Sequence, residues 1–100
     1  MAKYDLWLEN KEDNEILKFD GFEAETIPRE GEGISIHLTY ERFCYHLENS
    51  YTKKSINLNS SKWWNKFISY KKYKVETIDR EFYSKENKLE ERVFVKARQI

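Results

Sequence analysis

The stretch KYKVETIDREFYSKENKLEERVFVKAR, residues 72–98, decides the fold because its pattern predicts a β-hairpin. Its first half alternates apolar and polar residues at Tyr73 and Val75, then slips by one position so that Ile78 continues the alternation, as a β-bulge requires. The polar residues 84–87 predict the turn. One face of the last strand is then formed by Leu89, Glu91, Val93, Val95 and Ala97.

Three further strands are expected in the first 40 residues. The first has the period-two pattern of a half-buried strand at Tyr4, Leu6 and Leu8. A polar loop over residues 10–14 precedes a second strand, residues 15–26, in which Gly21 marks a bulge or a bend. Residues 27–33, IPREGEG, hold one proline and two glycines and predict a tight turn. The third strand follows, with alternating Ile34, Ile36 and Leu38.

Residues 40–70 lie between the third and fourth strands and change the period. Residues 43–47 fit a strand, but we favour a helix, whose stripe is formed by Tyr40, Phe43, Cys44, Leu47 and Tyr51. Polar residues 59–61 offer N-cap oxygens for a second short helix over residues 62–68. The sequence therefore predicts one α+β domain, residues 1–100: a curled, barrel-like antiparallel sheet of about five strands with one or two short helices inserted at about residues 40–70.

Two short motifs, Pro28-Arg29-Glu30-Gly31-Glu32-Gly33-Ile34 and Tyr73-Lys74-Val75, resemble a turn and a strand of uncharacterised small β-barrel proteins of phages and bacterial mobile elements. The resemblance covers about half the chain. It implies a curled five-stranded sheet with residues 40–70 inserted between the third and fourth strands. The chain departs from that group in the length of this insert, and the group brings no assigned activity.

The composition indicates a folded protein of the cytoplasm. Aromatic residues make up 16% of the chain, which argues against disorder. No apolar run is long enough to span a membrane, and no signal peptide is expected. Cys44 is the only cysteine, which is typical of a reducing compartment.

Catalytic, metal and cofactor sites are not expected. His37 and His46, the only histidines, lack the spacing of metal ligands, and Cys44 among aromatic residues is typical of an inert thiol. The chain has no phosphate-binding glycine loop and no nucleophile elbow. The sequence therefore predicts a protein that is not an enzyme.

Charge is divided unevenly between the two halves although the net charge is zero. Residues 1–48 hold five basic and twelve acidic side chains, whereas residues 49–100 hold thirteen basic and six acidic ones. Between residues 51 and 75, lysines are interleaved with aromatic rings. Either the halves pack together and neutralise each other, or this insert forms a binding surface. We expect the partner-binding residues to be Trp63, Lys62, Lys66, Tyr70, Lys53, Lys54, Lys71 and Lys72.

Trp63 and Trp64 are adjacent and cannot both point into the core from one helix, so we expect Trp64 to be buried and Trp63 to be the exposed anchor. A bacterial protein or nucleoprotein is the favoured partner, and small size with mobile-element character indicates an inhibitor of a bacterial defence system, such as an anti-CRISPR protein. The alternative is a module that binds RNA or single-stranded DNA by stacking bases on the insert's rings.

Overall fold

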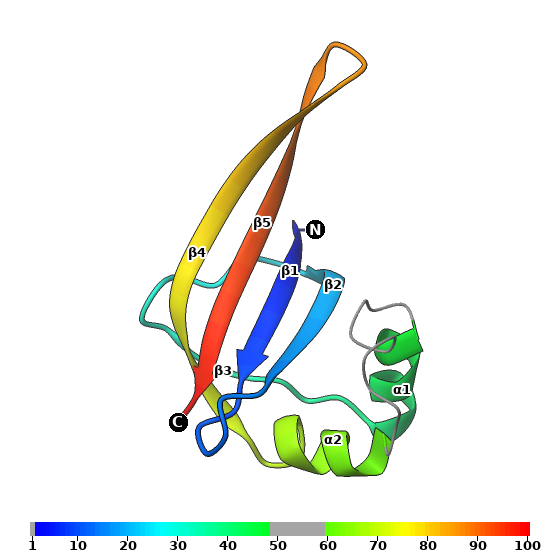
Figure 1. Cartoon of the computed structure of the whole chain (residues 1–100), viewed down its shortest axis with the longest axis vertical. Helices are drawn as coiled ribbons and strands as arrows, with labels where there is room; N and C mark the ends of the chain where they lie inside the picture. The colour runs from blue at the N-terminus through cyan, green and yellow to red at the C-terminus, as the bar shows by residue number, and fades with distance from the viewer. Residues whose placement is uncertain (1, 49–59) are drawn as a thin grey trace.

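The computed structural model describes residues 2–48 and 60–100, and it has an α+β fold with a curled five-stranded sheet that forms a half-barrel (Figure 1). The strands are β1 (Ala2–Glu9), β2 (Ile16–Ala24), β3 (Gly33–Ser35), β4 (Lys72–Lys85) and β5 (Lys88–Gln99). Two helices, α1 (Tyr40–Glu48) and α2 (Ser60–Phe67), lie between β3 and β4. The predicted fold class and the helical insert are therefore confirmed.

The sheet is mixed rather than wholly antiparallel, with the order β2-β1-β5-β4-β3. The first and last strands lie side by side in parallel, from Asp5 opposite Phe94 to Glu9 opposite Arg98. Periodicity does not report strand direction, so this pairing was missed. The third strand is also shorter than expected, because residues 36–39 leave the sheet and run toward the helices, where the carbonyl of Leu38 accepts a hydrogen bond from Trp64.

Two bulges curl the sheet, and both were predicted. In β2 the register shifts where Asp20 and Gly21 lie opposite Asp5, and Gly21 has a φ of 65°. In β4 it shifts at Glu76, between Val75 and Thr77. Because a bulge adds one residue to one strand, it bends that strand and increases the local twist.

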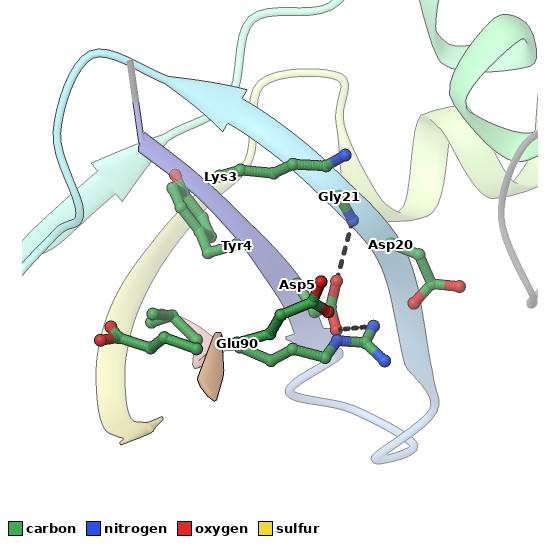
Figure 2. Close-up of a pocket in the computed structure, with 9 residues that line it drawn as sticks. Lys3, Tyr4, Asp5, Asp20, Gly21 and Glu90 are labelled. Atoms are coloured by element: carbon green, nitrogen blue, oxygen red, sulfur yellow. Dashed lines mark hydrogen bonds and ion pairs between the residues drawn. The ribbon is translucent and has the colours of Figure 1, made fainter. Parts of the chain in front are cut away.

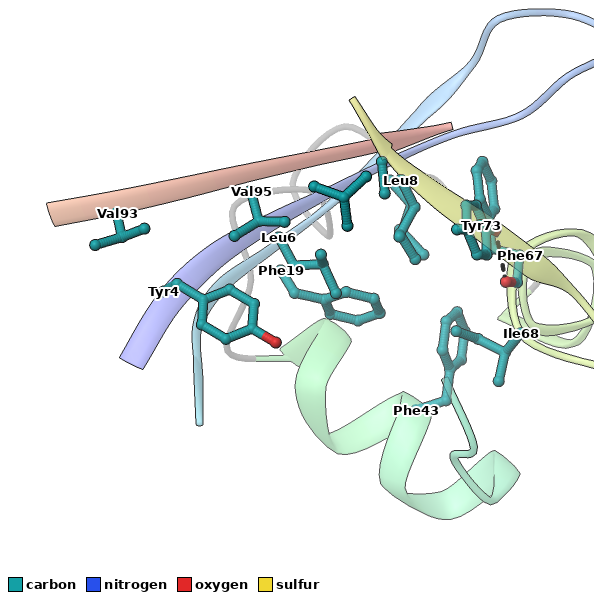
Figure 3. Close-up of a cluster of buried hydrophobic side chains, with 13 residues drawn as sticks. Tyr4, Leu6, Leu8, Phe19, Phe43, Phe67, Ile68, Tyr73, Val93 and Val95 are labelled. Atoms are coloured by element: carbon teal, nitrogen blue, oxygen red, sulfur yellow. Dashed lines mark hydrogen bonds between the residues drawn. The ribbon is translucent and has the colours of Figure 1, made fainter. Parts of the chain in front are cut away.

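The core fills the concave side of the sheet (Figure 3). Alternate residues of four strands supply most of it: Tyr4, Leu6, Leu8, Leu17, Phe19, Tyr73, Val75, Val93, Val95 and Ala97. The helices close the open side with Phe43 from α1 and with Phe67 and Ile68 at the end of α2. Phe43 lies edge-on to Phe19, with ring centroids 6.1 Å apart. The two helices therefore cover the open side of the half-barrel.

A buried polar cluster joins the C-terminal strand to α2 and to the first hairpin. The hydroxyl of Tyr73 donates to the carbonyl of Phe67 at 2.7 Å and accepts from the side chain of Gln99 at 3.3 Å. Gln99 also donates to the carbonyl of Lys66 and accepts from Asn10. Burial raises the pKa of Tyr73 well above its usual range, so the hydroxyl stays neutral and keeps its proton to donate.

Replacing Tyr73 with phenylalanine should lower the free energy of unfolding by about 1–3 kcal/mol, because the carbonyl of Phe67 loses its donor inside the protein. Tyr83→Phe is the matched control, since the Tyr83 hydroxyl bonds to Glu81 at an exposed site and should contribute under about 0.5 kcal/mol. Urea denaturation of both variants measures the difference. Equal costs would show that the buried cluster does not stabilise the fold.

Candidate functional site

An apolar groove lies between the chain that follows β3 and the C-terminal end of α2. It has a volume of about 400 Å³ and is lined by Ile36, His37, Leu38, Thr39, Trp64, Ile68, Ser69, Tyr70 and Lys71. The two walls come from residues about 30 positions apart in sequence. They are held together by the Trp64 indole, whose N–H donates to the carbonyl of Leu38 at 3.1 Å. We call this feature the Trp64 groove.

Tyr70 stands at the rim of the Trp64 groove in an unusual conformation. It follows α2 with a φ of 55°, the left-handed region that glycine or asparagine usually occupies after a helix. Its side chain is fully exposed, so no burial offsets the cost of this backbone. For a bulky residue that conformation is strained by about 1 kcal/mol or more.

The charged side chains along the Trp64 groove and beside it are basic. Lys71 is half-buried in the lining, and Lys72, exposed, begins β4 directly after it. His37 adds an exposed imidazole on the opposite wall. A ligand of this groove would therefore combine an apolar group with an acidic neighbour.

Of the expected binding residues, Tyr70 and Lys71 line the Trp64 groove, and Lys72 is adjacent. Lys62 and Trp63 are on α2 but outside the groove lining. Lys53 and Lys54 lie outside the described residues. The expected set is therefore only partly brought together.

Lys66 forms ion pairs with the first hairpin. Its ammonium pairs with Asp13 and, at 2.9 Å, with Glu15. Burial lowers the pKa of Lys66, but its hydrogen bonds to these carboxylates outweigh that effect and raise the pKa overall. Another bond between the halves joins Arg92 to Asp5. Folding therefore neutralises part of the charge asymmetry, and Lys66 is already paired.

Trp63 and Trp64 are both half-buried, and both pack against the core. Trp63 stacks on Phe67, with ring centroids 5.2 Å apart and planes 7° from parallel. Trp64 makes an edge contact with Tyr40. Trp64 was expected to be fully buried and Trp63 to project freely, and the structure shows neither. Trp63 is held by its stack on Phe67, and Trp64 is held at the surface of the core by Tyr40 and by its hydrogen bond to Leu38.

The His46 side chain packs against aromatic rings of β2. Its ring contacts Phe19 and Phe22, with centroids 5.9 and 5.4 Å apart. Burial lowers the pKa of His46, and the positive charge of Arg42 lowers it further. The folded protein therefore binds the proton less tightly than the unfolded chain does.

Acidification from pH 7.5 to 5 should reduce stability, because the unfolded chain takes up a proton at His46 below about pH 6.5 while the folded chain resists it. The His46→Leu variant should lose much of this pH dependence. His37→Gln is the matched control, since it removes the second histidine of the chain, which is exposed. Thermal melts across the range test this, and an unaltered slope in His46→Leu would contradict the assignment.

A second hollow, polar and with a volume of about 500 Å³, lies where β1 and β5 separate (Figure 2). Asp5 is buried at its base, where it accepts the N–H of Gly21 and pairs with Arg92, each at 2.8 Å. Lys3, Asp20 and Glu90 surround it. These bonds tie β2 and β5 to β1, so we assign the Asp5 cluster a structural role.

The sequence reasoning missed an exposed apolar group on the β4–β5 hairpin: Phe82, Tyr83 and Leu89. The period-two pattern was visible, but pattern alone does not show where the rest of the sheet ends. In the part of the chain that the structure describes, no three His, Cys, Asp or Glu side chains are grouped to hold a metal ion, and no helix is long and apolar enough to cross a membrane.

Comparison of the chain with protein-family models, with curated proteins and with solved structures finds no match. The assignment of a function therefore depends on the geometry of the surfaces described above.

Proposed function

We propose that this protein is a non-enzymatic binding protein of the cytoplasm that blocks a bacterial defence protein or nucleoprotein, as an anti-CRISPR protein does. The main support is Tyr70, an exposed aromatic residue in a strained left-handed conformation at the rim of an apolar groove. Such strain is often found at functional sites. A tyrosine with no packing role is explained if a partner contacts its ring.

The partner group that suits the Trp64 groove is an apolar side chain beside an acidic residue. Ile36, Leu38 and Ile68 would surround the apolar part, and Lys71 would attract the carboxylate. Tyrosine is enriched among residues that dominate binding energy at protein interfaces, and an anchor in a pocket is the usual arrangement. The resemblance of the two short motifs to phage and mobile-element proteins supports the choice of a defence protein as target.

Tyr70→Gly tests this proposal without the risk of unfolding. Glycine tolerates positive φ, so the free energy of unfolding should stay the same or rise by up to about 1 kcal/mol. Binding to the partner should weaken by about 2 kcal/mol, or roughly 30-fold. The measurement is affinity capture from lysates of bacteria with active defence systems, followed by titration of the captured protein.

Tyr45→Ala is the matched control, because Tyr45 is also exposed but lies on α1, outside the Trp64 groove. It should retain the same protein as the unaltered chain. Undiminished binding by Tyr70→Gly, or equal losses in both variants, would contradict the proposed site.

Single-stranded RNA is the second candidate ligand, favoured by the fully exposed Tyr70 ring next to Lys71 and Lys72. A base can stack on such a ring while lysines contact phosphates. The ion pairs of Lys66 with Asp13 and Glu15 argue against RNA binding, because this ammonium is already neutralised within the protein. Fluorescence anisotropy with a labelled oligonucleotide distinguishes the two: RNA binding should fall steeply with added salt and with Tyr70→Gly, whereas a protein-specific site should give no signal.

A further inference from the structure

The hairpin of β4 and β5 extends well beyond the rest of the sheet (Figure 1). β1 pairs with β5 only from Phe94 onward, and β3 pairs with β4 only over Lys72–Lys74. Residues 79–92, which we call the arm, therefore form strand pairs only within the β4–β5 hairpin. Every residue of the arm is exposed.

Large apolar side chains lie on this exposed arm. Phe82 is 60% exposed and Leu89 is 74% exposed. The register places Phe82 opposite Glu91 and Leu89 opposite Ser84, so the two apolar side chains are diagonal neighbours on one face. Tyr83, 45% exposed, lies on the other face. Exposed apolar side chains grouped in this way often mark a protein contact.

The outer edge of β4 offers unpaired backbone groups along the arm. The N–H and C=O of Val75 face outward, because they bond to the carbonyl of Glu32 and the N–H of Gly31. After the bulge at Glu76 the outward-facing residue is Ile78, whose N–H bonds to the Glu30 carboxylate. By alternation, residues 80, 82 and 84 face outward too, and no described residue pairs with their backbone on that side. Such an edge is a template for another strand.

We propose that the outer edge of β4 pairs with the same edge of a second copy of this chain, antiparallel and centred on Tyr83. In this register Glu81 lies opposite Lys85 of the second copy, and Lys85 opposite its Glu81. Phe82 lies opposite Ser84 of the second copy. The backbone N–H and C=O groups of both residues face outward, so the two residues can exchange hydrogen bonds. The result is a four-stranded sheet with twofold symmetry, in which the Phe82 and Leu89 side chains of both copies gather on one face.

Charge complementarity favours a second copy over an unrelated protein. An isologous contact must be complementary to itself, and the sequence Glu81-Phe82-Tyr83-Ser84-Lys85 has opposite charges at equal distances from its centre. Natural edge strands are usually protected from pairing by bulges, prolines or charged side chains. The sequence from Asp79 to Lys85 contains no proline, and in this register its charges at Glu81 and Lys85 attract the second copy. This contact does not involve the Trp64 groove and is independent of the function proposed for it.

A charge exchange tests the contact. The unaltered chain should dimerise in sedimentation equilibrium, whereas Glu81→Lys and Lys85→Glu should each weaken dimerisation about tenfold or more, because like charges then lie opposite at both ends. An equimolar mixture of the two variants should restore the dimer, since each then complements the other. Circular dichroism melts of each variant check that the arm remains folded. A monomeric unaltered chain at millimolar concentration, or a mixture no tighter than the single variants, would overturn the proposal.

Cross-linking tests the register. In a Cys44→Ser background, Tyr83→Cys should form a disulfide-linked dimer on oxidation, because directly opposed residues without mutual backbone bonds lie about 4.5 Å apart at Cα, within disulfide range. Asp79→Cys is the matched control on the same strand and face. Its two copies would lie about 27 Å apart, so it should remain monomeric. Equal cross-linking of both variants, or none of Tyr83→Cys, would exclude the proposed pairing.

Discussion

Replacing Phe43 with alanine should lower the free energy of unfolding by about 3–5 kcal/mol, the largest loss expected from any single truncation discussed. Phe43 is fully buried and joins α1 to the sheet through its edge contact with Phe19. Its removal leaves a cavity between helix and sheet that the short α1 cannot close. For a domain of this size the melting temperature should fall by about 4–8 °C per kcal/mol.

Phe43→Leu separates the cavity from the chemistry of the ring. Leucine keeps most of the volume, so the expected cost is under about 1.5 kcal/mol. Urea denaturation of both variants, monitored by circular dichroism, gives the two free energies. Equal and small costs would mean that α1 is not packed on the sheet as described.

Replacing Trp64 with alanine should cost about 3 kcal/mol, at the lower end of the range for large aromatic residues because the indole is only half-buried. Two contributions are lost: the contacts with the core, and the hydrogen bond to the carbonyl of Leu38 that joins the walls of the groove. Partner binding should fall as well, since the groove depends on both walls.

Trp64→Phe keeps an aromatic ring, smaller than the indole, and removes the N–H, so it should cost about 1–2 kcal/mol and keep part of the packing. A comparison of both variants by thermal melting separates packing from hydrogen bonding. Were Trp64→Ala as stable as the unaltered protein, α2 would not be anchored through this side chain.

Much of the fold was predictable because burial on one side of a sheet imposes a period of two. The alternation in residues 72–98 located the long hairpin, and its slip at Glu76 located the bulge. The helix that begins at Tyr40 followed from the spacing of its apolar residues. These signals are local, and the physical constraint behind each acts within a few residues.

The remaining features depend on contacts between distant residues. The parallel pairing of β1 with β5 joins the two ends of the chain, and no local pattern reports strand direction. The engagement of Lys66 by Asp13 and Glu15 spans about half the sequence. The arm is exposed because the pairing of β1 with β5 begins only at Phe94 and the pairing of β3 with β4 does not extend beyond Lys74, which the alternation of β4 and β5 cannot show.

The candidate site was predictable in part. Tyr70 and Lys71 were named for their chemistry, as aromatic and basic residues of the insert, and both line the Trp64 groove. The left-handed backbone of Tyr70 has no signature in the sequence, because tyrosine is not a residue that favours it. Ile36 and Leu38 were assigned to a strand, and only the early end of β3 makes them a wall of the groove.

The most direct test of the central claim is a photo-cross-link at position 70. The chain with p-benzoyl-phenylalanine in place of Tyr70 should, on irradiation in a bacterial lysate that contains the target, form a covalent adduct with one protein, and the chain labelled at Tyr45 should not. The adduct should resist nuclease and disappear when excess unaltered protein competes. Absence of a protein adduct at position 70, or an adduct that nuclease removes, would contradict a protein-binding function for the Trp64 groove.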